Sequence, residues 1–520
     1  MDYPLPSTIQ EAEAMVLALY QPAPPETIAK IQDTLHRMQR APSGWWIARD
    51  LLGHADDKVK FFGALTLIVK LNTESSSLSS DDASELRQNL VGWFVKSLDD
   101  GSGAMVIRKL SSALVTFFLF FPAQWEFCIR HLCCSLSEGT ALPQERIDGS
   151  INMSHILETL HSRKLQAALW FAGSLVDEAA KIEMNSARHV GLYETLTRNV
   201  PDALALMSHC FSRQGSADST SYGTQKDSIT CLQSWIWFSQ RISSHSDELI
   251  GSLRALIRPT IASLAENELY EPAVELLSDI LSNYSGFLTE DHYESLFSLF
   301  ETQWSRERYQ RLVEGDFDFD SVQFGQLMIA LGDSKVEALI HGVDDRSSRF
   351  LAHLRGLLSA QGYPVSDDKI FVPALEFWST YVETLTDSIY SDEEESKPWA
   401  TFMTLKPTDE GMRETIDHAL TQLGPLLARS IVHNIGGNAS RSELDRLSEP
   451  LKKMVNHHAK ARIWLEQALN DSSFPGQQLS GDEKALFLRK IINLRGSRGT
   501  NQVVREFWLA ARGSKFAYVS

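Results

Sequence analysis

Few residues in this 520-residue sequence have the types and spacing that carry out chemistry. Two groups could bind a metal: the adjacent pair His457 and His458, and the set Cys128, His131 and Cys133. Adjacent residues point to different faces of a helix, and the cysteine–histidine set has no further ligand at zinc-like spacing. We interpret both groups as structural or solvated side chains, and we expect no metal site.

Motifs for nucleotide and acyl chemistry are missing from the sequence as well. It contains no GxxxxGK[ST] loop, no HExxH and no GxSxG. The pair Gly436-Gly437 could approach a phosphate, but it stands between two helical stretches and is more typical of a helix C-terminus. Because no acid, base and nucleophile occur together, we expect no catalytic residue and no cofactor. A binding protein is favoured over an enzyme.

Charge and cysteine usage restrict the partners and the compartment. The formal net charge is -18, which repels nucleic acid and favours basic partner proteins, although acidity can also serve solubility alone. The five cysteines include no CxxC pair, which indicates reduced thiols in the cytosol or nucleus. The most apolar run, Leu110 to Phe121, is about half a membrane span, so it predicts a buried helix and no membrane insertion.

Hydrophobic periodicity is helical almost throughout. In residues 57–72 one predicted apolar stripe contains Phe61, Phe62, Leu65, Ile68 and Val69, and Lys60 and Lys70 lie on the opposite side. In residues 104–121 a second stripe contains Ile107, Leu110, Leu114, Phe117, Phe118 and Phe121, with Lys109, Ser112 and Thr116 opposite. Each stripe needs a neighbouring helix to cover it.

Helix-breaking residues recur roughly every fifteen to twenty positions, and paired helices about 40 residues apart are typical of HEAT or armadillo arrays. The sequence therefore predicts an all-α fold, an alpha-alpha superhelix (solenoid) of degenerate HEAT/armadillo repeats. The acidic run that begins at Asp392 is the longest break in composition. We expect a helical block over 1–390, an acidic linker over 391–411 and a second helical block over 412–520.

Two stretches near the N-terminus carry a family resemblance. They read IQDTLHRMQRAPSGWWIARDLL (31–52) and DKVKFFGALTLIVKL (57–71). Their pattern resembles the importin-beta N-terminal region, here at about residues 25–98. The positions that match this pattern, which we expect to be mainly structural, are Gln39, Pro42, Trp45, Leu51, Phe61, Phe62 and Thr66.

Later stretches resemble the importin 13 and transportin-3 branch of this superfamily, in a fungal-looking form. They include GDFDFDSVQFGQLMIALGD (315–333), GYPVSDDKIFVPALEFW (362–378) and IGGNASRSELDRLSEPLKKMV (435–455). Family members are much longer than this chain. The resemblance therefore implies that a central block of repeats is missing, with its junction near 391–411.

The resemblance implies a nuclear transport receptor that shuttles between cytoplasm and nucleus. Its expected partners are Ran in the GTP form on the inner helices, Phe-Gly repeats of nucleoporins on the outer helices, and basic cargo proteins. Lys60, Lys70 and Lys109 lie opposite apolar stripes, so they are the candidate Ran contacts, and Lys70→Glu should weaken binding without disturbing the fold. The alternative is a HEAT-repeat scaffold or adaptor outside nuclear transport, which the architecture alone does not exclude.

Overall fold

The computed structural model describes residues 4–182, 187–212, 219–241, 246–341, 345–357 and 369–391. Over these residues the secondary structure is helical and contains no strand. The all-α, HEAT-type fold predicted from the sequence is confirmed. The chain divides into two compact units, Met1–Leu276 and Leu277–Ser520, which are described separately below.

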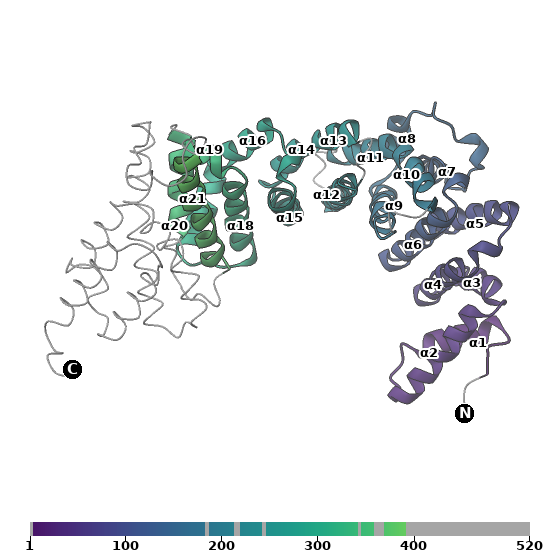
Figure 1. The fold of residues 1–520 in the computed structure, drawn as a ribbon. Helices are drawn as coiled ribbons and strands as arrows, with labels where there is room; N and C mark the ends of the chain where they lie inside the picture. The colour runs from purple at the N-terminus through teal and green to yellow at the C-terminus, as the bar shows by residue number, and fades with distance from the viewer. Residues whose placement is uncertain are drawn as a thin grey trace, which may run out of the picture. The chain divides into compact units, whose positions relative to one another are not determined.

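Unit 1 contains α1 to α14 and most of α15 (Figure 1). The bounds are α1 Ile9–Ala18, α2 Pro25–Arg40, α3 Gly44–Leu52, α4 Asp57–Glu74, α5 Ser80–Asp99, α6 Ala104–Phe120, α7 Cys128–Glu138, α8 Met153–Thr159, α9 Ser162–Ala179, α10 Ala187–Arg198, α11 Val200–Ser212, α12 Ser219–Ser239, α13 Ser246–Arg254, α14 Ile257–Ser263 and α15 Asn267–Asn283. Short 3-10 turns are η1 Ser75–Ser77, η2 Pro122–Gln124 and η3 Gln144–Arg146.

The helices of unit 1 form two rows. Helices α4, α6, α9 and α12 pack side by side in chain order, and we call them row B (Figure 1). Helices α3, α5, α7 and α11 pack against them and form row A. Two helices in contact bury one stripe each, so a stack of such pairs shares a continuous core.

The predicted stripe of α6 is confirmed except at Phe121, which is half-buried. Ile107, Leu110, Leu114, Phe117 and Phe118 are buried, whereas the three polar residues predicted opposite are half-buried. The apolar run that begins at Leu110 thus forms a buried helix. None of the described helices is both long enough and apolar enough to cross a lipid bilayer.

The predicted stripe of α4 is wrong in large part. Phe62 is buried, but Phe61 and Leu65 are only half-buried, and the supposedly solvated Lys60 and Lys70 are buried. The reason is that α4 contacts α1, α2, α3 and α6, so more than one face is covered. Gly63 lets α3 approach closely, because a Cβ at this position would lie 3.0 Å from the carbonyl oxygen of Ala48.

Basic side chains join successive repeats through main-chain acceptors. Lys164 at the start of α9 donates to the carbonyl oxygen of Leu136 in α7, at 2.8 Å. Its neighbour Arg163 donates to the carbonyl oxygen of Ser102, and Arg241 after α12 donates to that of Ala180. Leu136 and Ala180 stand at the C-terminal ends of α7 and α9, where carbonyl groups lack intrahelical donors, so two of these bonds satisfy such groups.

Unit 2 begins within α15 and contains the remaining described helices. These are α16 Glu290–Phe300, α17 Gln303–Val313, α18 Phe319–Ser334, α19 Val336–His341, α20 Asp345–Leu357 and α21 Phe371–Ser391, with the 3-10 turn η4 Ser285–Phe287. Helix α18 packs against α17, α20 and α21. These contacts include aromatic pairs, for example Trp304 of α17 and Phe324 of α18, whose ring centroids lie 5.8 Å apart.

The predicted linker 391–411 and block 412–520 lie outside the described residues, apart from Ser391 at the end of α21. So do His457, His458 and the pair Gly436-Gly437. These predictions, with the missing central block, stay predictions.

Candidate partner-binding face

The family-motif residues come together at the contacts among α2, α3 and α4. The amide Nε2 of Gln39 donates to Thr66 Oγ1 at 3.3 Å, and Thr66 donates to the carbonyl oxygen of Phe62 at 2.8 Å. Leu51 is fully buried beside them, and the exposed Pro42 lies in the α2–α3 turn. These motif residues therefore lie at the junction of three helices, and their mainly structural role stays a prediction.

Lys70 is the centre of this junction. Its ammonium donates to the carbonyl oxygen of Ala41 at 3.0 Å, pairs with Glu74, and lies 5.7 Å from the ring centroid of Trp45. Trp45 in turn donates its indole N–H to the second oxygen of Glu74 at 2.8 Å. The Lys70 bond holds the pKa of Glu74 below its ordinary value, against burial, and the Trp45 bond acts in the same direction.

Neither Lys60 nor Lys70 presents its charge to a partner. Lys70 is 0% exposed, and Lys60 is buried with its Nζ donating to Ser102 Oγ at 2.8 Å. The expectation that Lys70→Glu leaves the fold intact is also wrong, because the new carboxylate would be buried beside Glu74 with no cation. Of the three lysine candidates, only Lys109 lies at an accessible surface.

Lys109 lies at a shallow cavity between α4 and α6. Its Nζ is 5.1 Å from the ring centroid of Phe61, and the cavity has a volume of about 430 Å³. Met105, which is 48% exposed, lines the same cavity, and Arg108 is the second cation beside it. An apolar surface next to two cations can hold an apolar side chain and attract acidic groups beside it.

The same face continues across α9 and α12. The guanidinium of Arg108 lies 4.5 Å from the ring centroid of Trp170 on α9, and Gln166 donates to Asp227 on α12 at 3.0 Å. Burial raises the pKa of the Asp227 carboxyl, which the neighbouring donors only partly offset. Polar and aromatic side chains of three row-B helices therefore adjoin the cavity.

Sequence reasoning missed Met105, Arg108 and Trp170. A signal for two of them existed, because Met105, Arg108 and Ser112 recur at helical spacing on the side of α6 opposite its apolar stripe. No comparable signal linked Trp170 to Arg108, since they come from different helices.

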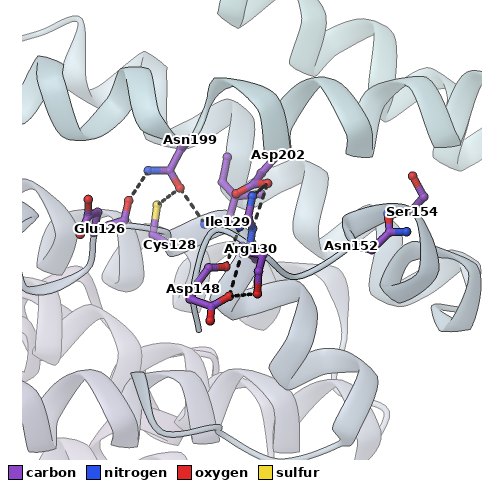
Figure 2. A network of polar contacts seen from close by, with 10 residues as sticks. Glu126, Cys128, Ile129, Arg130, Asp148, Asn152, Ser154, Asn199 and Asp202 are labelled. Atoms are coloured by element: carbon purple, nitrogen blue, oxygen red, sulfur yellow. Dashed lines mark hydrogen bonds and ion pairs between the residues drawn. The ribbon is translucent and has the colours of Figure 1, made fainter. Parts of the chain in front are cut away.

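A buried polar network joins α7 to α11 (Figure 2). Arg130 donates to one oxygen of Asp202 through Nε at 3.2 Å and through a terminal nitrogen at 2.7 Å. A third donation reaches the carbonyl oxygen of Asp148 at 2.7 Å. Burial raises the pKa of the Asp202 carboxyl, and Arg130 opposes this only in part.

Asn199 closes the N-terminal end of α7 in the same network (Figure 2). Its side-chain oxygen accepts from the main-chain N–H of Ile129 at 3.2 Å and from the thiol of Cys128 at 3.4 Å. Its amide nitrogen donates to the carbonyl oxygen of Glu126 at 2.7 Å. The first N–H groups of a helix lack partners within it, so Asn199 fixes α7 against the α10–α11 turn.

The predicted cysteine–histidine set is structural. Trp125 can only donate, so His131 Nδ1 accepts its indole N–H at 2.8 Å, and Nε2 therefore carries the proton that it donates to the carbonyl oxygen of Leu142. Burial lowers the pKa of His131 to about 4 and raises those of Cys128 and Cys133. The described residues contain no group of three or more His, Cys, Asp or Glu placed to hold a metal ion.

The sequence is similar to importins, which are members of the importin-beta superfamily. Curated relatives that match its sequence are importins from yeast, bird and mammals. A scan against models of known protein families finds no match.

Two of these relatives illustrate the similarity. Importin beta-like protein kap111 of Schizosaccharomyces pombe is 24% identical over 394 residues, which cover 73% of this chain and 39% of kap111. Importin-13 of Homo sapiens is 30% identical over 105 residues, 20% of this chain and 11% of the relative. This chain thus spans well under half the length of the relatives it matches. The match to a yeast protein is consistent with the fungal character expected.

Among solved structures, Kap121p bound to RanGTP is similar with a TM-score of 0.38 and 14% identity, over 97% of this chain and 47% of that one. Kap121p bound to the SUMO protease Ulp1p is similar with a TM-score of 0.39 and 14% identity, over 98% and 46%.

Proposed function

We propose that this chain is a nuclear transport receptor that binds Ran in its GTP form through row B, at the cavity between α4 and α6. The names of its relatives, which are importins, support the class of function. The observation that carries the site is the pairing of exposed Met105 and half-buried Phe61 with the cations Arg108 and Lys109. Such a surface recognises a protein partner by shape and by charge.

Nucleotide discrimination follows from the rigidity of this face. The switch segments of Ran-type GTPases change shape with the γ-phosphate, so a fixed surface that complements one shape rejects the other. The Lys70–Glu74–Trp45 junction fixes α4 against α3, and the Arg130–Asp202 network fixes α7 against α11. No chemical step is required, so the chain acts as a binding protein and not as an enzyme.

Two further partners belong to this proposal. Phe-Gly repeats of nucleoporins would bind the row-A helices, where Trp46 of α3 is 45% exposed. Basic cargo proteins would be attracted by the net charge of -18. A receptor with these partners shuttles between cytoplasm and nucleus.

The test is a titration of the full chain with Ran loaded with GTP or GDP. We expect tight binding of the GTP form only. Lys109→Glu should reduce the association rate severalfold at low salt and much less at high salt, because the effect is a screened charge interaction. Lys96→Glu, an exposed row-A lysine on α5, makes the same charge change and should have little effect.

Equal affinity for both nucleotide forms would contradict the receptor function, and so would no binding by a chain shown to be folded. Either result would leave the alternative, a HEAT-repeat scaffold. If Lys96→Glu weakened binding as much as Lys109→Glu, the α4–α6 cavity would not be the site.

A further inference from the structure

Unit 2 contains a second cavity, between α16–α17 and α20. Its volume is about 350 Å³, at the lower end of the range of ligand pockets in proteins. Its apolar wall consists of Phe297, Phe300 and Phe350. The ring of Phe350 meets those of Phe297 and Phe300 edge to face, at centroid distances of 5.1 and 5.6 Å. Phe297 is only half-buried, so the cavity offers an aromatic surface to an incoming side chain.

Three guanidinium groups surround this aromatic wall. Arg349 pairs with Glu301 at 2.6 Å, and Arg346 pairs with Glu294 and, at 3.7 Å, with Glu301. Arg306 donates to the main-chain carbonyl oxygen of Glu301 at 2.9 Å, and its charge also acts on the Glu301 carboxylate. The arginines hold the pKa of Glu301 below its ordinary value, with the Arg349 bond as the largest cause.

The local charge is opposite to that of the whole chain. Among the described residues, the cavity wall contains three arginines and one carboxylate, with Glu294 paired to Arg346 beside it, whereas the full sequence has a net charge of -18. Burial and the nearby Arg306 and Arg349 lower the pKa of His353 at the same wall. The side chain of Arg349 is 59% exposed, which puts the cationic rim at the surface, where part of a larger chain can reach it.

We propose that this cavity binds a partner protein through a short acidic segment in which an aromatic side chain stands beside carboxylates. The aromatic ring would pack on Phe297 and Phe350, and the carboxylates would accept hydrogen bonds from Arg306 and Arg349. Guanidinium–carboxylate bonds are charge-assisted and can be bidentate, so they supply the selectivity, and the aromatic wall supplies apolar contact. This binding is independent of the proposed Ran site in unit 1.

The experiment uses the full chain and three fluorescein-labelled dodecapeptides with the centres Asp-Phe-Asp, Asn-Phe-Asn and Gly-Phe-Gly. We expect the acidic peptide to bind in a salt-dependent way and the two neutral peptides to bind at least about tenfold more weakly. The double variant R306Q/R349Q should bind the acidic peptide with about tenfold lower affinity, and its affinity for the two neutral peptides should not change. Phe297→Ala should weaken the same peptide severalfold.

The matched control is Arg37→Gln on α2, which removes the same charge from a side chain that is 43% exposed and paired with Asp33. It should leave peptide binding unchanged. Equal binding of the three peptides would overturn the proposal, because the cavity would then recognise the aromatic ring alone. It would equally be overturned if Arg37→Gln weakened binding as much as R306Q/R349Q, or if no peptide bound. Titration of the same variants with Ran-GTP separates this result from a failure of the proposed function.

Discussion

Two buried ion pairs of unit 1 are built from the same kinds of groups in different surroundings. Lys70 is completely buried, but its partner Glu74 is 33% exposed and also accepts from Trp45. In the other pair both side chains are nearly inaccessible, 10% for Arg130 and 2% for Asp202. One oxygen of Asp202 has no hydrogen-bond partner.

The difference has opposite effects on the two carboxyl groups. The pKa of Glu74 is lowered by its donors, whereas the pKa of Asp202 is raised by burial. A buried pair is costly to form and costly to break on one side, because removal of one partner leaves the other charge uncompensated. An ion pair that keeps contact with water loses less stability when one partner is removed, because water can solvate the remaining charge. The variants below test this contrast.

Asp202→Ala should produce the largest effect. Arg130 would remain buried without its carboxylate, and the expected loss is about 3–5 kcal/mol. Hydrogen exchange of the α7 and α11 amides, followed by mass spectrometry, measures the local free energy of opening. The matched double variant Arg130→Met/Asp202→Leu should recover much of the loss, because it removes both charges. A double variant as unstable as Asp202→Ala would contradict the explanation.

Lys70→Ala comes second, with an expected loss of about 2–4 kcal/mol. The reason is a cavity at the α2–α3–α4 junction together with the lost bond to Ala41. Lys70→Met keeps most of the volume and should lose less, since Glu74 can turn to water. Urea unfolding of the two variants gives the order of their free energies of unfolding. If Lys70→Met were as damaging as Asp202→Ala, the contrast between the two pairs would be wrong.

Acidification should affect the two pairs in opposite directions. The stabilisation from Glu74 is complete above its ordinary pKa of 4.5 and is lost as the pH falls through its lower folded pKa. Asp202 has a raised pKa in the folded protein, so its protonated form stabilises the fold. This stabilisation is complete below the ordinary pKa of 3.8 and is lost as the pH rises through the raised folded pKa. Glu74→Gln should therefore lose less stability than the wild type on acidification below pH 4.5, and Asp202→Asn should lose more. Urea midpoints at pH 6 and at pH values below 4.5 check both signs.

Lys109→Gln should have the smallest effect on stability, within about 0.5 kcal/mol. Its ammonium lies over the ring of Phe61 at a half-exposed position, and its charge remains close to water. Thermal unfolding of Lys109→Gln and Lys70→Met, measured under the same conditions, compares the stability that each variant loses. A loss as large as that of Lys70→Met would mean that Lys109 belongs to the core and is not available to a partner.

The fold could be predicted from the sequence wherever the polar side of a helix remains accessible, even when several helices contact it. The stripe of α6 follows the period of a helix because its polar side remains accessible. The stripe of α4 could not be predicted, because helices cover it on several sides and its lysines are satisfied by Ala41, Glu74 and Ser102. A buried lysine with partners distant in sequence looks like a solvated lysine to any rule based on periodicity.

The candidate sites were predictable to a smaller extent. Lys109 was identified from its place opposite an apolar stripe, but Trp170 and Arg108 are 62 positions apart and meet only in the folded chain. The arginine cavity of unit 2 likewise combines Glu301, which follows α16, with Arg349 of α20. Local patterns contain no information about such pairs, since packing between repeats creates them.

The main-chain acceptors that join successive repeats bear on how such an array can change over generations. Lys164, Arg163 and Arg241 each bind a carbonyl oxygen, and every residue type provides one. The residue that supplies the acceptor can therefore mutate without breaking the joint, so drift at one repeat does not require a simultaneous change in its neighbour. The basic donor is constrained, and at Lys164 so is Asp99, whose carboxylate lies 2.9 Å from the ammonium. An array joined in this way can lose almost all internal sequence similarity and still inherit the same stacking.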